Sequence, residues 1–177
     1  MEDEIQIYAA GFVVKERYTD SFTGLVKELE ENRRPLFDCP DEIIIHLFAQ
    51  FGKEIIKDPS LMSIPGLSYL SLWLRRENLR AIYLINFKRE PGTKDPILVD
   101  SRIEMIYVPR GVVCHWIAGN IPLLGFFSLV LATLGKNASI LKIHPNVYKF
   151  LNLLLQKLEQ VTVTIDGMSY SGSIITS

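Results

Sequence analysis

The stretch RGVVCHWIAGNIPLLGFFSLVLATLGKNASILKIHP, residues 110–145, decides the fold that we expect for this chain. Its mostly apolar residues 112–119 predict a strand. A helix from Pro122 to about Leu134 follows, and the glycine after it suits a helix C-terminus. The nearly continuous apolar run at 138–143 predicts a second strand, of the kind found in parallel sheets covered on both faces.

A further helix is predicted over residues 146–160, after this second strand. The order strand, helix, strand, helix implies a right-handed crossover and part of a doubly wound, Rossmann-like parallel sheet. In the tail, residues 161–177, two strands are expected around the turn Asp166-Gly167, which is a hairpin signal. The apolar side of the predicted helix carries Val147, Phe150, Leu151, Leu154 and Leu158.

The part of the chain before this stretch predicts a strand and then helices. Residues 4–14 read as the strand, and the first helix follows with Asp20 or Ser21 as its cap. A second helix has Pro40 at its first position, and residues 67–87 look helical, in one or two pieces. The second helix buries a stripe of Ile44, Leu47, Phe48, Phe51 and Ile55, and the predicted packing aromatics of the next helical segment are Tyr69, Trp73 and Tyr83.

The polar, turn-rich segment 88–96 is the best internal boundary. Beyond it, residues 102–108 predict another strand. We therefore expect an α/β chain with three parts. These are a strand plus helical amino-terminal region (1–90), a partial α/β layer (91–160) and a β-hairpin tail (161–177).

The composition limits the classes of partner. The 177 residues are 48% hydrophobic and 22% charged, with a formal net charge of -1. A globular domain is expected, and nucleic acid as the main ligand is disfavoured because there is no basic excess. The longest apolar run, 121–134, is shorter than the about 20 residues that span a bilayer, so no membrane span is predicted. Two distant cysteines and an acidic start indicate a reducing, cytoplasmic setting.

The junction between the strand at 112–119 and the next helix is the candidate ligand site. In open α/β sheets, ligands bind outside the carboxyl ends of the strands. Gly119 allows a close approach by a ligand or another backbone, and the Asn120 amide can donate to a developing oxyanion. From spacing alone, the commoner role of such an asparagine, a turn or cap residue, is favoured for Asn120. Lys142 ends the next strand at the same edge, where it can meet a phosphate or ribose hydroxyl, or simply extend into solvent.

The cysteines and histidines give no catalytic pair. Cys114 and His115 are consecutive in a predicted strand, so their side chains point to opposite faces. We expect Cys114 to be a small core residue and Cys39 to be structural. No spacing of histidines and cysteines matches a metal site, so no metal is expected.

Residues 108–145 resemble the nucleotide-binding segment of the aldehyde dehydrogenase superfamily. More narrowly, they are similar to the long-chain acyl-CoA (fatty acyl) reductases of bacterial luminescence systems. The resemblance lies in the "PRGVV" strand entry, the asparagine before a proline, the apolar helix, and "KNASILK" with its strand-end lysine and a following proline. It implies reduction of a fatty acyl thioester to a fatty aldehyde, by way of an acyl-cysteine and NADPH.

The same resemblance implies roles for individual residues. Asn120 would help form the oxyanion hole, and Lys142 would contact the adenosine ribose or its 2′-phosphate. Ile117, Gly119 and Pro122 would also line the cofactor site. Contacts within a multienzyme complex or a homo-oligomer are compatible with this family.

Two departures from the family pattern bear on these roles. Pro145 stands three residues after Lys142 rather than next to it, and no glutamate follows soon after. This leaves the choice between NAD and NADP open. The family's catalytic cysteine lies downstream of the lysine strand, so we expect this chain to be an amino-terminal part of the reductase, inactive alone. Two alternatives stay open: a truncated, non-catalytic nucleotide-binding or partner subunit, and a plain structural α/β domain.

Overall fold

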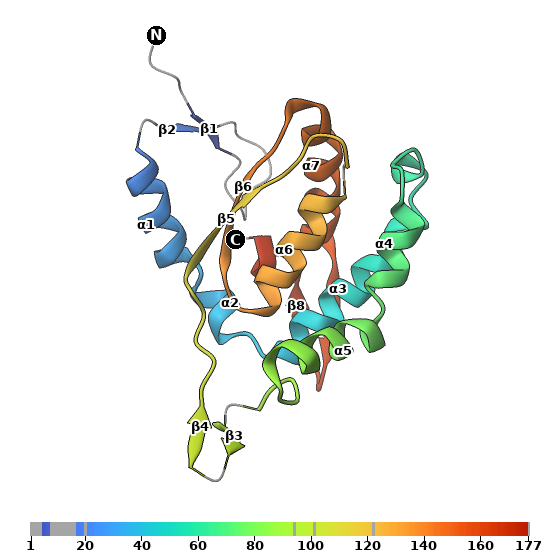
Figure 1. Cartoon of the computed structure of the whole chain (residues 1–177). Coiled ribbons are helices and arrows are strands. Elements are labelled where there is room, and N and C mark those ends of the chain that lie inside the picture. Colours follow the sequence, from blue (N-terminus) through green and yellow to red (C-terminus); the bar gives the residue numbers. More distant parts are fainter. Residues whose placement is uncertain are drawn as a thin grey trace.

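The computed structural model is a mixed α/β fold in which helices pack with a parallel strand pair and a C-terminal antiparallel hairpin (Figure 1). It describes residues 5–7, 17–19, 21–93, 95–100, 102–121 and 123–176. Its helices are α1 (Phe22–Asn32), α2 (Arg34–Asp38), α3 (Asp41–Ile55), the 3-10 turn η1 (Pro59–Leu61), α4 (Leu67–Trp73), α5 (Arg76–Phe87), α6 (Leu124–Leu134), α7 (Pro145–Gln160) and α8 (Ser173–Thr176). Its strands are β1 (Ile5–Ile7), β2 (Arg17–Thr19), β3 (Ile97–Asp100), β4 (Ile103–Met105), β5 (Val112–Trp116), β6 (Ala138–Lys142), β7 (Thr162–Ile165) and β8 (Met168–Ser171).

The core is built around α3, which contacts α4, α5, α6, α7 and β7. The predicted stripe on this helix is confirmed, because its five members are all almost fully buried. Phe126 of α6 packs on this stripe, stacked on Phe51 at 5.1 Å between ring centroids and edge-on to Phe48 at 6.4 Å. Burying three phenylalanines removes much apolar surface from water, which is the main force that holds α6 on α3.

The helix starts follow the capping residues in the sequence. Ser21 caps α1, and its hydroxyl accepts a hydrogen bond from the Gly24 N–H. Pro40 is the N-cap of α3 rather than its first residue, and Asp41 and Glu42 occupy the first turn as expected. The helical segment at 67–87 is divided, because α4 ends at Trp73 and α5 begins three residues later. Asp20, Pro122 and most of the strand predicted at 4–14 lie outside the described residues.

The parallel pair β5 and β6 confirms the predicted strand, helix, strand unit. All five residues of each strand are in register, from Val112 opposite Ala138 to Trp116 opposite Lys142. The connection between them is α6, which contacts both strands. Within the described residues this sheet has two strands, because β4 pairs with β3 in a separate antiparallel hairpin that projects from the helices (Figure 1).

The end of α6 is as predicted, because Gly135 is its C-cap. The φ of this glycine, -85°, is ordinary. The left-handed conformation falls on the next residue, Lys136, with φ 60°. A non-glycine residue in this region is uncommon. Here a set of buried contacts holds the lysine in place.

The C-terminal hairpin is confirmed. β7 and β8 pair antiparallel around Asp166 and Gly167. The φ angles of these two residues are 52° and 78°. Such positive values suit the tight turn that Asp-Gly favours. The second strand ends at Ser171, and residues 173–176 form the short helix α8 instead of continuing the strand.

The predicted apolar side of α7 faces the core. Four of its five residues are buried, and Phe150 is partly buried. This packing places the start of α7 next to the end of β6, where the candidate site lies.

Candidate functional site at the carboxyl edge of the parallel strands

The carboxyl edge of the parallel pair brings an exposed aromatic ring and a cation together. Trp116 and Lys142 are the last residues of β5 and β6 and are register partners. The Lys142 ammonium lies over the Trp116 ring, 4.0 Å from its centroid. Both residues are exposed, and Trp116, at 79%, is unusually open for so large an apolar side chain. Such a cation–π pair is worth about 0.5–1 kcal/mol at an exposed site.

The residues after β5 continue along this edge. The N–H of Ile117 donates to the Lys142 carbonyl at 3.0 Å, which carries the pairing one residue beyond the strand. Gly119 lies against His144, since a Cβ at position 119 would meet the Cβ and Cγ of His144 at 2.8 Å. The close neighbour of Gly119 is therefore a histidine side chain, where a ligand or another backbone was predicted.

Asn120 lies in an exposed turn between β5 and α6. The N-cap of α6 is Leu123, so Asn120 is not the cap of that helix. Its amide is thus placed on the loop that follows β5, at the carboxyl edge where ligands bind in open α/β sheets. Pro122, the remaining residue of the predicted cofactor set, lies outside the described residues.

The start of α7 borders the same edge. The His144 Nδ1 accepts a hydrogen bond from the Asn146 N–H at 3.2 Å and so caps this 16-residue helix. Helix N-termini carry unpaired N–H groups and positive potential, which favours anions nearby. The edge therefore offers an exposed ring, an ammonium group, a neutral amide and a helix start, a set of groups suited to a nucleotide and a polarised carbonyl.

Cys114 and His115 point to opposite faces of β5, as predicted. Cys114 is exposed, so the expectation that it is a core residue is wrong: its face of β5 is left uncovered by the described elements. His115 is buried, with Nδ1 2.6 Å from the Ser128 hydroxyl and Nε2 3.2 Å from the Ser139 hydroxyl. Burial lowers the pKa of His115. This favours a neutral ring that ties α6 to β6.

Cys39 is buried next to the start of α3. Burial raises the pKa of the Cys39 thiol, and the nearby Lys136 charge lowers it by a smaller amount. A buried thiol with a raised pKa carries little thiolate and is a poor nucleophile. The structure thus agrees with the structural role expected for Cys39.

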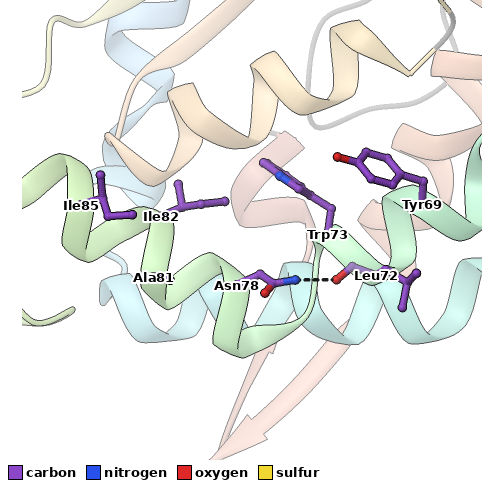
Figure 2. Close-up of a pocket in the computed structure, with 7 residues that line it drawn as sticks. All are labelled: Tyr69, Leu72, Trp73, Asn78, Ala81, Ile82 and Ile85. Carbon is purple, nitrogen blue, oxygen red and sulfur yellow. Dashed lines mark hydrogen bonds between the residues drawn. The ribbon is translucent and has the colours of Figure 1, made fainter.

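A second feature, which the sequence did not predict, is an apolar groove between α4 and α5 with a volume of about 420 Å³ (Figure 2). Tyr69, expected to be a packing residue, is 64% exposed here, whereas Tyr83 is buried as expected. Tyr69 and Trp73 make edge contacts with Phe127 of α6, at 5.8 and 4.8 Å between centroids. The lining is Tyr69, Leu72 and Trp73 from α4 and Asn78, Ala81, Ile82 and Ile85 from α5.

The sequence did hold a signal for this groove. Leu79 and Tyr83 of α5 are four residues apart and face the core. Ile82 and Ile85 lie three residues apart on another face of the same helix. A short helix that is apolar on two faces needs a second apolar contact, or leaves one face open for a ligand.

The described residues hold neither a metal-ligating cluster nor a membrane-spanning helix. No three histidine, cysteine, aspartate or glutamate residues there are grouped so that they could hold a metal ion. Among the described helices, none has both the length and the apolar character needed to cross a membrane.

Comparison with known protein families places the chain. The family model for acyl-CoA reductase (LuxC) matches residues 51–168, which is more than half of the chain and includes β5, α6, β6 and the α4–α5 groove. No curated protein and no solved structure matches the chain. The match agrees with the resemblance drawn from residues 108–145. The chain belongs to the acyl-CoA reductase (LuxC) family.

Proposed function

We propose that this chain supplies the oxyanion donor and a nucleotide contact for the NADPH-dependent reduction of a fatty acyl thioester to a fatty aldehyde. Membership of the acyl-CoA reductase family supports the substrate class and the type of reaction. The observation that carries the proposal is the shared carboxyl edge of β5 and β6. At this edge Lys142 lies beside the exposed Trp116, and the turn that holds Asn120 follows β5.

The residues at this edge fit a dinucleotide. Lys142 is an exposed cation. Such an ammonium group can pair with a phosphate or a ribose hydroxyl. Ile117 and Gly119 shape the backbone between the strand and Asn120, and Pro122 completes the segment that we assign to cofactor binding. When bound, NADPH supplies the hydride for the reaction.

Asn120 acts on the thioester carbonyl in this proposal. Its side-chain N–H donates to the carbonyl oxygen as negative charge develops during attack by a thiolate. Because the amide is neutral, it adds no charge that would raise the pKa of a neighbouring thiol. Removing one such donor from an oxyanion hole typically costs a factor of about 100 to 1,000 in rate.

The reaction divides into two transfers. A cysteine thiolate attacks the thioester carbon, and the carbon–sulfur bond to coenzyme A breaks, which releases that thiol after protonation. Addition of hydride to the acyl-cysteine carbonyl and loss of the cysteine thiolate then give the aldehyde. We assign the nucleophile to neither Cys39, which is buried with a raised pKa, nor Cys114, which faces away from His115.

The state of the two cysteines also favours a second candidate, a non-catalytic nucleotide-binding or partner subunit. In both cases the chain binds its ligands without turning them over by itself, and we place it in the cytoplasm. The two candidates differ in whether Asn120 polarises a bound thioester.

Thermal unfolding with nucleotide tests the shared part of the proposal. A ligand present at 100 times its dissociation constant adds about 2.7 kcal/mol to stability, so saturating NADPH should raise the Tm clearly. Lys142→Met should reduce this shift, whereas Lys149→Met, which removes an exposed lysine from α7, should not. Equal shifts in both variants, or no shift with either NADPH or NADH, would contradict the assignment.

A further inference from the structure

We propose that the α4–α5 groove, continued by the exposed face of α6, binds the acyl chain of the thioester substrate. This inference rests on the proposed function and adds a site to it. The groove holds about 420 Å³. Pockets that bind small molecules typically hold from about 300 Å³ to about 1000 Å³, so the groove is large enough for such a ligand.

The groove matches a hydrocarbon in its chemistry. None of its seven lining residues is charged. The Asn78 amide already donates to the Leu72 carbonyl at 2.8 Å, as the dashed line in Figure 2 shows. A peptide needs hydrogen-bond partners for its backbone, which this lining scarcely offers, whereas an acyl chain needs none. Exposed apolar surface gathered in one groove is typical of sites that contact a ligand, a membrane or another protein.

The exposed side of α6 leads from the groove toward Asn120. Figure 2 shows Tyr69 and Trp73 reaching from α4 toward the helix above them, where Phe127 meets both rings. Leu124 and Leu131 lie three residues before and four after Phe127, so they share its face. Both leucines are exposed, and the exposed Ile121 joins this face to Asn120.

This arrangement gives the substrate a direction. The thioester carbonyl meets Asn120, and the chain runs over Ile121 and the outer face of α6 into the groove. Phe127, where α6 meets the groove, lies about 4.5 Å beyond Leu124 along the helix axis, and Leu131 lies about 10 Å beyond it. An extended acyl chain advances by about 1.2 Å per bond, so its first carbons cross Ile121, about four more lead from Leu124 to Phe127, and about eight lead from Leu124 to Leu131. Long acyl chains should therefore reach the groove, and short ones should not.

The experiment uses the chain's own tryptophans. It has two, and Trp73 lines the groove while Trp116 does not. In a Trp116→Phe chain, titration with tetradecanoyl-CoA below its micelle concentration should change Trp73 emission to saturation. Hexanoyl-CoA and coenzyme A alone should leave that emission unchanged.

A matched pair of variants locates the binding. Ile85→Glu puts a charge on a groove residue that is 71% exposed, and Ile106→Glu puts the same charge on an isoleucine 64% exposed outside the groove. Ile85→Glu should weaken tetradecanoyl-CoA binding at least tenfold, and Ile106→Glu should leave it within twofold. Both positions are exposed, so folding should survive, and circular dichroism checks this.

Three results would overturn the groove proposal. The first is tetradecanoyl-CoA binding that is unchanged by Ile85→Glu. The second is a Trp73 signal that is silent or equal for the two chain lengths. The third is a dimer, seen by sedimentation, that Ile85→Glu dissociates without changing ligand binding, which would assign the groove to a second copy. The NADPH-dependent Tm shift, measured on the same variants, reports on the nucleotide edge separately, so either proposal can fail alone.

Discussion

Lys136 and Asp41 form a buried ion pair, with 3.2 Å between Nζ and Oδ1 and side chains only 13% and 12% exposed. The other oxygen of Asp41 accepts from the Tyr83 hydroxyl at 2.6 Å and from the Gly92 N–H at 3.2 Å. The Lys136 ammonium also donates to the carbonyls of Leu36 and Cys39. The pair thus fastens the turn before β6, and with it the strand that carries Lys142, to the start of α3 and to α5.

Removing one partner of this ion pair should destabilise the fold strongly. Burial alone raises the pKa of Asp41, but the Tyr83 hydrogen bond, the Lys136 charge and the Gly92 N–H outweigh it and hold the pKa below its usual range. Asp41→Asn removes the anion and leaves a buried ammonium unpaired, so it should lower the free energy of unfolding by about 3 kcal/mol in urea titrations. The control is Asp38→Asn, which breaks the exposed pair with Arg34. It should cost less than about 0.5 kcal/mol.

A double-mutant cycle separates the pair from its surroundings. Asp41→Asn combined with Lys136→Met should lose less stability than the two single changes added together, with a coupling of at least about 1 kcal/mol. If Asp41→Asn and Asp38→Asn cost the same, the ion pair does not hold the turn before β6.

Stability should fall between pH 7 and pH 5 because of His115. Burial lowers the pKa of His115 in the folded chain. The unfolded value is about 6.5, so the unfolded chain takes up the proton first. The stabilisation is complete above about pH 6.5 and is lost as the pH falls through the lower pKa of the folded state. Urea titrations at the two pH values should show a smaller loss in His115→Gln than in the unsubstituted chain.

His46 provides the control for this pH dependence. Its pKa is also lowered, first by burial and then by the Arg76 charge, although Glu42 acts in the opposite direction. His46→Gln should therefore retain the part of the pH dependence that belongs to His115. An unchanged pH dependence in His115→Gln would mean that this ring is not protonated on unfolding in that range.

Gly119→Ala should distort the edge locally. The new Cβ would lie 2.8 Å from two carbons of His144, so the ring must move and its cap on α7 is weakened. Losing a cap costs about 1 kcal/mol, which thermal unfolding can measure. The same change in a His144→Ala background should cost less, because the clash is gone. An equal cost in both backgrounds would point to backbone strain rather than to the histidine contact.

Asn120 should polarise the bound thioester. Infrared spectra of acyl-CoA labelled with carbon-13 at the carbonyl should show a lowered stretching frequency when the chain is saturated with it, because a donor hydrogen-bonds the oxygen. Asn120→Ala should remove the shift while the acyl chain still binds. A shift that persists in Asn120→Ala would assign the donor to another group and favour the non-catalytic candidate.

Much of the fold could be predicted because local patterns agree with it. The stripe on α3, the split helical segment, the α6 crossover and the Asp-Gly turn are each set by a few neighbouring residues. The ends of these elements were harder to predict. The left-handed residue after α6 is Lys136 rather than Gly135, because contacts with Asp41 and other residues distant in the sequence hold it there.

The site could be predicted only in its outline. The parallel register puts Lys142 at the carboxyl edge, as the crossover implied, but nothing local indicates that the Trp116 ring lies beneath its ammonium. The exposure of Cys114 and the opening of the α4–α5 groove depend on which faces other elements cover. Such coverage is a property of the packed molecule. Residue spacing shows that α5 is apolar on two faces, but it does not show which of them stays uncovered.

The most direct measurement is energy transfer from Trp116 to NADPH in a Trp73→Phe chain, where Trp116 is the remaining tryptophan. We predict that NADPH quenches Trp116 emission and gains nicotinamide emission to saturation. Lys142→Met should weaken this binding at least tenfold, and Lys149→Met should change it less than twofold. Nucleotide that raises the Tm without altering Trp116 emission, or that binds equally in both lysine variants, would contradict the placement of the nucleotide at this edge.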